Sequence, residues 1–255
     1  MKVATWNVNS LRIRLPQVLE WLETTAPDVV GLQETKLQDK DFPVAAVEAA
    51  GYEVAYAGQK TYNGVALLSR QPIVDVLTEI EGLDDPQRRV IAATVGSVRV
   101  YNLYVPNGQE VGSEKFSYKL RWLEHLRRQL SSELTTHPET IVMGDFNIAP
   151  ADRDVHDPKA WAGKILCSEP ERRALGKLFD LGFADTFRLR PQPEGTFSWW
   201  DYRAAGFRRN LGLRIDLVLA SEALVRRCRE STIDRTPRGW DRPSDHTPAV
   251  TIFED

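Results

Sequence analysis

Apolar residues along the chain fall into short runs, and the spacing within each run predicts its secondary structure. Runs of strand length that are rich in Val, Ile and aromatic residues predict β-strands. Such runs cover residues 2–8, 28–34, 52–58, 64–70, 90–95, 98–105, 140–146, 212–221 and 247–253. Gly and Pro punctuation between the middle runs predicts antiparallel hairpins.

Helical spacing separates several of these runs. In residues 14–25 apolar side chains recur at intervals of three and four, which predicts a helix after the first strand. Residues 113–134 predict the clearest helix, with Ser113 as its N-cap, and shorter helices are expected at 43–50 and 169–182. No low-complexity linker or tandem repeat interrupts this order. We therefore predict one α/β domain over residues 1–255, with mixed sheets and outer helices.

Composition narrows the class of protein. A hydrophobic content of 42% in 255 residues suffices for a sizeable core, and a net charge of −3 argues against a DNA-coating protein but not against an enzyme with a local basic groove. The two cysteines, Cys167 and Cys228, lack metal-type spacing, which favours a reducing, cytoplasmic setting. No signal-peptide pattern or membrane-length apolar run occurs, so we expect no membrane partner. We also expect a monomer.

Polar residues collect where the apolar runs end. The residues at these positions are Asn7, Glu34, Tyr104, Asn107, Asp145 and Asn147. Asp216 lies within a run, and the pair Asp245-His246 immediately precedes the run 247–253. If the strand ends meet at one rim, four carboxylates crowd together, and like charges raise pKa values unless a cation or hydrogen bonds compensate. Oxygen ligands without a Cys/His cluster favour a hard ion such as Mg²⁺ or Mn²⁺ over Zn²⁺.

Each of these residues also has a structural explanation when it is taken alone. Asp145 and Asn147 are typical turn residues, Glu34 is typical of a solvated strand end, and His246 of a cap. Asp216 is harder to explain, because a buried carboxylate needs a partner. The functional interpretation therefore depends on all of the positions together.

Nine stretches in consistent order resemble the exonuclease III family of apurinic/apyrimidinic endonucleases, within the DNase I-like endonuclease/exonuclease/phosphatase group. They lie between residues 5 and 248 and read TWNVNSLR, LQETK, YNGVALLSR, RRVI, YVPNG, GDFNIAP, FSWWDYR, GLRIDLVLAS and PSDHTP. The resemblance implies a four-layer α/β sandwich, two mixed β-sheets packed face to face with helices outside. It also implies Mg²⁺-dependent hydrolysis of duplex DNA 5′ to an abasic site, with 3′-phosphodiesterase and often 3′→5′ exonuclease activity.

The same resemblance implies roles for the polar residues. Asp145 would orient or deprotonate the attacking water, and Asp216 would keep His246 protonated for a hydrogen bond to the phosphate. Tyr104 would reach the same phosphate through its phenol. The residues expected at the metal are Asn7, Glu34, Asp145, Asn147, Asp245 and His246, with Asn9 acting through water. Whether Asp145 is the formal base, and whether one or two metals bind, stays open.

DNA contacts are implied as well. Trp199 and Leu213 would form a small apolar pocket for a base-less sugar, supported by Trp200, and extrusion is easiest where no base is stacked. The expected phosphate contacts are Asn107, Arg89, Lys115, Lys119 and Arg214, with Arg88, Arg208 and Arg209 as further candidates. The segment 155–168 varies most in the family, which leaves an alternative in which the enzyme mainly processes 3′ ends.

Two other functional hypotheses compete with that of a DNA-repair nuclease. A nonspecific DNase, or a phosphoesterase acting on phosphoinositides or sphingomyelin, would share the acids, the histidine and the metal. Trp199, Leu213 and the stretch GLRID resemble the DNA-repair branch instead. A catalytically silent DNA-binding protein is disfavoured, because such relatives should lose some of the residues retained here, namely Glu34, Asp145, Asn147, Asp216 and His246.

Overall fold

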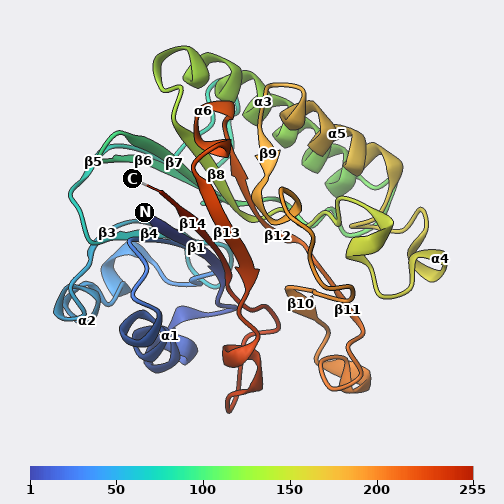
Figure 1. Cartoon of the computed structure of the whole chain (residues 1–255), viewed down its shortest axis with the longest axis horizontal. Coiled ribbons are helices and arrows are strands. Elements are labelled where there is room, and N and C mark those ends of the chain that lie inside the picture. Colours follow the sequence, from blue (N-terminus) through green and yellow to red (C-terminus); the bar gives the residue numbers. More distant parts are fainter. Residues whose placement is uncertain (255) are drawn as a thin grey trace.

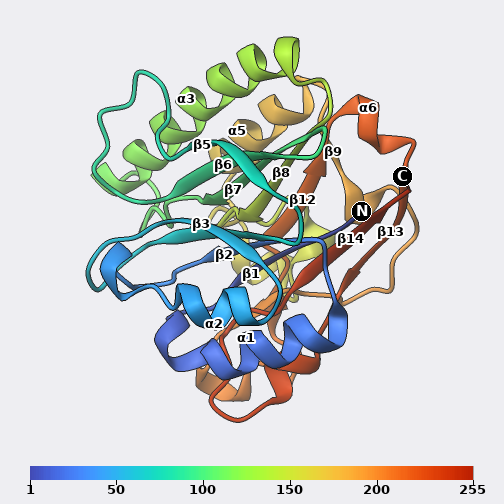
Figure 2. The same ribbon diagram turned by 90° about the vertical axis from the view of Figure 1, so that its left-hand side faces the viewer.

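Two mixed β-sheets lie face to face, with helices on both outer surfaces, in the computed structural model, which describes residues 1–254 (Figures 1 and 2). The first sheet has the order β13-β14-β1-β2-β4-β3 and the second has the order β5-β6-β7-β8-β12-β9. A separate two-stranded ribbon pairs β10 with β11. This arrangement confirms the predicted four-layer α/β sandwich.

The strands of the first sheet are β1 (Lys2–Asn7), β2 (Val29–Gln33), β3 (Glu53–Ala57), β4 (Val65–Ser69), β13 (Cys228–Ile233) and β14 (Ala249–Phe253). Those of the second sheet are β5 (Ile73–Leu77), β6 (Val90–Val95), β7 (Val98–Tyr104), β8 (Thr140–Asp145), β9 (Ala184–Asp185) and β12 (Asp216–Ala220). The ribbon consists of β10 (Trp199–Trp200) and β11 (Gly212–Leu213). The helices are α1 (Leu11–Thr25), α2 (Val44–Ala49), α3 (Glu114–Thr136), α4 (Pro158–Trp161), α5 (Glu169–Phe179) and α6 (Glu222–Val225).

Each sheet contains one parallel pair, β1 with β2 and β7 with β8. Parallel neighbours need a crossover connection, and α1 and α3 supply it. The remaining pairs are antiparallel, as the Gly and Pro punctuation predicts. The predicted N-cap of α3 is confirmed, because the Ser113 hydroxyl accepts a hydrogen bond from the Phe116 amide at 3.1 Å.

Three apolar layers separate the four structural layers. The central one fills the space between the sheets and includes Val29, Leu67 and Val100. A second layer packs the first sheet against α1 and α2, and a third packs the second sheet against α3 and α5. Strands in the middle of each sheet are therefore buried on both faces, which explains their continuous apolar runs.

Asn102 ties the two sheets together close to the rim where the polar residues gather. From β7 its amide nitrogen donates to the backbone oxygens of Leu32 and Ala66, at 2.9 Å each, and its side-chain oxygen accepts from Gln33 at 2.5 Å. Gly31 makes this approach possible, because a Cβ there would lie 2.6 Å from the Asn102 side-chain oxygen. Strand β7 is thereby held at a fixed spacing from β2 and β4 of the facing sheet.

Some elements differ from the sequence prediction. The edge strands β5 and β13 were not predicted. In β13 most side chains are charged or polar, whereas β5 is a short run of apolar residues interrupted by Asp75, with Val74 and Val76 exposed at the sheet edge. The run at 212–221 is one predicted strand but forms two, since β11 pairs with β10 while β12 joins the second sheet. Within residues 1–254, no helix is both long and apolar enough to cross a membrane.

Candidate active site

The polar residues meet at one rim of the sandwich because the strands that carry them end there. Asn7 ends β1, Tyr104 ends β7 and Asp145 ends β8. The register places Tyr104 beside Asp145 and Asp145 opposite Asp216, which begins the antiparallel strand β12. Strand pairing therefore brings Tyr104, Asp145 and Asp216 together, and the packing of the two sheets adds Asn7 from the first sheet.

His246 lies between two buried carboxylates. Its Nδ1 is 2.9 Å from Oδ2 of Asp216, and its Nε2 is 3.7 Å from Oδ2 of Asp145. Burial by itself would lower the pKa of His246, but the charges of Asp216 and then Asp145 outweigh it and raise the pKa to about 10. The imidazole is therefore a cation at neutral pH, with Nδ1 donating to Asp216.

Asp145 is almost completely buried and hydrogen-bonded on both oxygens. Oδ2 accepts from the Asn7 amide at 2.9 Å, and Oδ1 accepts from the backbone N–H of Asn147 at 2.9 Å. Burial raises the pKa of Asp145 to about 7, and Asp216 adds to the rise while His246 opposes it. This carboxylate can exchange a proton near neutral pH, as a catalytic acid or base must.

Glu34 lies next to this cluster, directly after β2. The amide nitrogen of Asn7 donates to Oε1 of Glu34 at 3.0 Å as well as to Asp145, so one amide bridges the two carboxylates. On its other side Glu34 pairs with Lys36 at 2.9 Å. Glu34 has a positive φ of 51°, a backbone conformation that turns the chain sharply at the rim.

The donor set fits a hard divalent cation. Carboxylate oxygens of Glu34 and Asp145 converge on the amide group of Asn7, which now presents its nitrogen to them and would present its oxygen to a cation after a rotation of the amide. A second group, Asp145, Asp216 and His246, has ligand atoms within 4.8 Å of one another. In that group Nδ1 of the imidazole is already hydrogen-bonded to Asp216. The side with Glu34 and Asn7 is the better cation position.

Tyr104 and two asparagines supply donors around the acids. The pKa of Tyr104 is raised well above its usual value by burial and by the charges of Glu34 and Asp145, so the phenol keeps its proton. The Asn107 amide donates to the side-chain oxygen of Asn147 at 3.1 Å, and the Asn147 amide donates to the backbone oxygen of Val105 at 3.0 Å. These contacts fix the orientation of both asparagines.

Trp199 is joined to the same rim through Asp245. Its indole N–H donates to Oδ2 of Asp245 at 3.0 Å, while Asn9 donates to Oδ1 at 2.9 Å. In the ribbon, Trp199 faces Leu213 in register. Leu213 has no exposed surface and packs with Val155 beneath the ribbon, so the expected direct contact of Leu213 with a sugar is corrected to a supporting position.

Two predicted DNA contacts are wrong. Lys119 is fully buried and pairs with Glu171 at 2.5 Å. Arg214 is also fully buried, and it pairs with Asp154 at 2.7 Å and with Asp185 at 2.6 Å. A side chain without exposed surface cannot reach a DNA backbone, so both cations serve the interior of the protein.

The remaining cationic candidates are accessible. Arg89 and Lys115 line a cavity of about 670 Å³ together with Tyr104 and Asn107, and the Arg89 guanidinium lies 4.7 Å from the centre of the Tyr104 ring. Arg208 and Arg209 are exposed between β10 and β11, and Arg88 is half-buried. Four predicted residues therefore share one hollow beside the acids.

Two serines that support the site were not predicted. The Ser198 hydroxyl accepts from the backbone N–H groups of Ile215 and Asp216, at 3.0 Å each. The Ser244 hydroxyl donates to the backbone oxygen of Asn7 at 2.7 Å and accepts from the His246 amide at 3.2 Å. Their only signal in the sequence is their position inside the stretches FSWW and PSDH.

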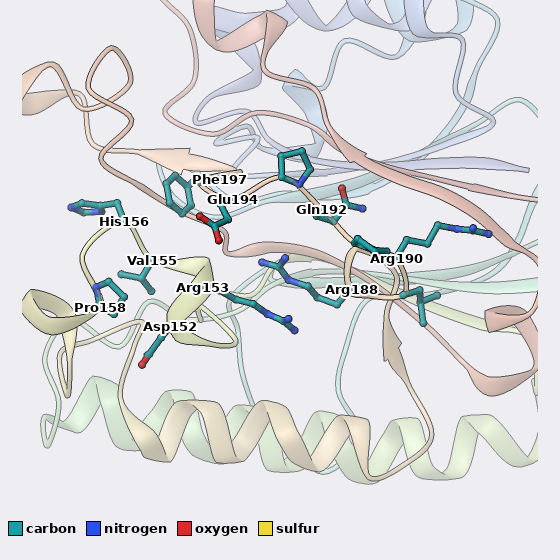
Figure 3. A pocket seen from close by; sticks show the side chains of 14 residues that line it. Asp152, Arg153, Val155, His156, Pro158, Arg188, Arg190, Gln192, Glu194 and Phe197 are labelled. Atoms are coloured by element: carbon teal, nitrogen blue, oxygen red, sulfur yellow. The ribbon is translucent and has the colours of Figure 1, made fainter.

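A second cavity, of about 760 Å³, lies beside the ribbon and is separate from the acids (Figure 3). Its wall includes Arg153, Arg188 and Arg190, with the carboxylate of Glu194 among them, and His156 from the variable segment 155–168. None of the predicted metal or catalytic residues lines it. This second cavity is therefore not part of the cluster of acids at the strand ends.

Comparison with known proteins agrees with this geometry. Residues 4–246 match the family model described as the endonuclease/exonuclease/phosphatase family. The chain belongs to this family. Exodeoxyribonuclease III of Haemophilus influenzae is 40% identical, over 100% of both chains. A Neisseria 3′ phosphatase, NExo, solved with a product DNA hairpin, is 46% identical with a TM-score of 0.98, and an AP endonuclease from Archaeoglobus fulgidus is 38% identical with a TM-score of 0.96, each over 100% of both chains. The predicted resemblance to the exonuclease III family is confirmed.

Proposed function

We propose that this family member is a DNA-repair nuclease that hydrolyses phosphodiester bonds in duplex DNA with Mg²⁺, or Mn²⁺ in its place. The observation that carries the proposal is the buried row of charged side chains in which His246 lies between Asp216 and Asp145, next to the Glu34–Asn7 pair. It joins a cationic donor, a carboxylate that titrates near neutrality and a cation position. The relatives with high identity are DNA nucleases by name.

The side chains around the acids suit in-line attack on a phosphodiester, which builds negative charge on the phosphate oxygens. Protonated His246 and the phenol of Tyr104 are fixed donors for that charge, and each well-placed donor is worth roughly 3–4 kcal/mol in the transition state. Asp145 orients the attacking water or accepts its proton. Asn147, whose backbone N–H holds Asp145, also supplies a donor to the phosphate.

The metal, when bound, would stabilise the phosphate charge and activate water. We propose that Glu34, Asn7 and Asp145 hold it, with Asn147, Asp245 and His246 of the predicted set nearby. Asp245 accepts hydrogen bonds from Trp199 and Asn9, which leaves its oxygens less free for direct coordination. His246 then acts as a donor and not as a ligand.

We propose two activities for this site, because two observations favour different substrates. Trp199, half-buried at the rim and supported by Leu213, favours a small pocket for a base-less sugar and hence cleavage 5′ to an abasic site. The likeness to the Neisseria 3′ phosphatase favours removal of blocked 3′ ends as the main activity. Asn107, Arg89 and Lys115 are the proposed phosphate contacts for either substrate.

The test uses three labelled duplexes, which carry an internal abasic site, a 3′-blocked nick and an intact recessed 3′ end. We expect Mg²⁺-dependent cleavage of the first two that EDTA abolishes and that Asp145→Asn reduces by at least roughly 10²-fold. Asp84→Asn, a change at an exposed acid, is the matched control. Equal rates for Asp145→Asn and wild type would refute the catalytic assignment.

Variants of Trp199 then separate the two activities. Trp199→Ala removes the ring, whereas Trp199→Phe keeps a ring and removes only the bond to Asp245. If Trp199 forms a sugar pocket, Trp199→Ala should impair abasic cleavage at least tenfold more than Trp199→Phe does. Trp199→Ala should also impair 3′-end removal less than it impairs abasic cleavage. Equal impairment of both reactions by both variants would assign Trp199 to holding Asp245.

The monomeric state and the cytoplasmic setting stay predictions.

A further inference from the structure

A completely buried ion pair lies directly behind the site. Lys119 projects from α3, and its Nζ donates to Oε1 of Glu171 at 2.5 Å, to the backbone oxygen of Asn147 at 2.7 Å and to that of Asn107 at 3.1 Å. Neither the Lys119 nor the Glu171 side chain has any exposed surface. An ammonium group has three N–H donors, so all three are used, and two of them hold the backbone of residues proposed to contact the substrate.

Glu171 connects this cation to a third segment. It lies in the first turn of α5, where Oε1 also accepts from the Leu166 amide at 3.1 Å. Its Oε2 accepts from the Ser168 amide at 3.1 Å and from the Ser168 hydroxyl at 2.6 Å. The pair thus joins three segments that are distant in the sequence, those around residues 107, 147 and 166.

The backbone of Asn147 is held from both sides. Its φ of 49° is a left-handed conformation, which asparagine adopts more readily than most residues other than glycine. In that conformation the Asn147 carbonyl turns inward to Lys119, while its N–H holds Asp145 at 2.9 Å. The peptide groups on either side of Asn147 are therefore fixed by one buried cation on one side and by one carboxylate on the other.

Gly108 lets the loop approach this lysine. It has a φ of 90°, and a Cβ at this position would lie 3.1 Å from the Cδ atom of Lys119. The loop that carries Asn107 is thereby packed against the aliphatic part of the same side chain that holds its carbonyl. Lys119 contacts the loop through both its stem and its charge.

We infer that Lys119 is a positioning residue for the hydrolysis proposed above, holding Asn107 and Asn147 in the geometry that presents their amides and the Asp145 carboxylate to the substrate. It does not touch DNA, because it has no exposed surface. A displacement of about 1 Å at reacting groups can cost 10²-fold in rate, so loss of this contact should appear in kcat. The inference rests on the proposed nuclease function, and wild-type cleavage of the duplexes tests that function separately.

The alternative is that the pair only stabilises the fold, and a second pair, between β7 and the same helix and with its glutamate 19% exposed, serves as the control. Arg99 pairs with Glu133 near the end of α3 at 2.9 Å, with its side chain 5% exposed, and it contacts none of the residues of the site. Lys119→Met and Arg99→Met both leave a carboxylate without its partner. We expect both to lower the melting temperature, but only Lys119→Met to lower kcat on the folded protein, by 10- to 100-fold, with KM changed less than threefold.

The double variant Lys119→Met/Glu171→Gln distinguishes position from charge. It leaves no unpaired buried charge, and the glutamine oxygen still accepts from the Leu166 or Ser168 amides, so the melting temperature should recover towards that of the wild type. We expect kcat to stay low, because the Asn147 carbonyl still lacks its donor. Recovery of kcat together with the melting temperature, or an equal loss of kcat in Arg99→Met, would overturn the inference. The double variant also provides the test if Lys119→Met alone does not fold.

Discussion

Replacement of Asp216 by Asn tests the charge arrangement around His246 most directly. Asp216 is the first of the charges that raise the pKa of this imidazole from 6.5 to about 10. At about 1.4 kcal/mol for each pKa unit, the net rise favours the protonated form by on the order of 5 kcal/mol, after the opposing cost of burial. The asparagine keeps the size of the side chain and removes one of the two charges.

The expected shift follows from the causes of each pKa. Without the Asp216 charge, burial counts for more, so the pKa of His246 should fall by roughly 2 units, the scale of one opposite charge in contact. Asp216 also raises the pKa of Asp145, which should therefore fall as well. Because a protonated His246 and an ionised Asp145 are both required, the whole pH optimum should move towards acid.

Two measurements check this prediction. The pH dependence of kcat/KM on abasic duplex should show both limbs displaced downward in Asp216→Asn, with a loss of roughly 10²–10³-fold at pH 8. In NMR spectra, the His246 ring should titrate below pH 9 in the variant and only near pH 10 in the wild type. An imidazole that titrates at the same pH in both proteins would refute the reasoning, whatever happens to the rate.

The same pKa shift makes a statement about stability. The folded-state pKa of His246 lies above its unfolded value, so the contribution of the charged imidazole to the free energy of unfolding is fully present below pH 6.5. That contribution is lost as the pH rises through about 10. Urea unfolding at pH 7 and pH 10 should therefore show a larger loss for wild type than for Asp216→Asn.

Two further predictions follow from buried or bridged charges. Arg214→Met leaves Asp154 and Asp185 without their shared cation, so the free energy of unfolding, measured by urea titration, should fall by about 3–5 kcal/mol. The control Arg88→Met, at a half-exposed pair, should lower it by less than about 1 kcal/mol. An unchanged stability with a weaker salt dependence of DNA binding would restore Arg214 as a DNA contact. Glu34→Gln should raise the Mg²⁺ concentration for half-maximal activity at least tenfold, while Glu48→Gln, at an exposed helix position, leaves it unchanged. Equal Mg²⁺ dependence of the two variants would refute the assignment of Glu34 as a metal ligand.

The sequence by itself determined the architecture and the identity of the polar residues at the rim. Continuous apolar runs specify strands that are buried on both faces, and their spacing around helical segments implies a layered α/β fold. Because strands place their last residues at the edge of a sheet, Asn7, Tyr104 and Asp145 were predictable as neighbours from their positions alone. The edge strand β13 was not predictable, because most of its residues are charged or polar. The edge strand β5 was missed although its residues are apolar apart from Asp75.

Only the tertiary structure decided which charges face solvent and which face one another. Lys119 and Arg214 look like surface cations in the sequence, yet each finds a buried carboxylate from a distant segment. No local pattern encodes such a pairing, because Glu171 and Asp154 become neighbours of these cations only when the sheets and outer helices pack. The pKa values of Asp145 and His246 likewise arise from burial and from charges brought together across two sheets, so they are properties of the folded protein.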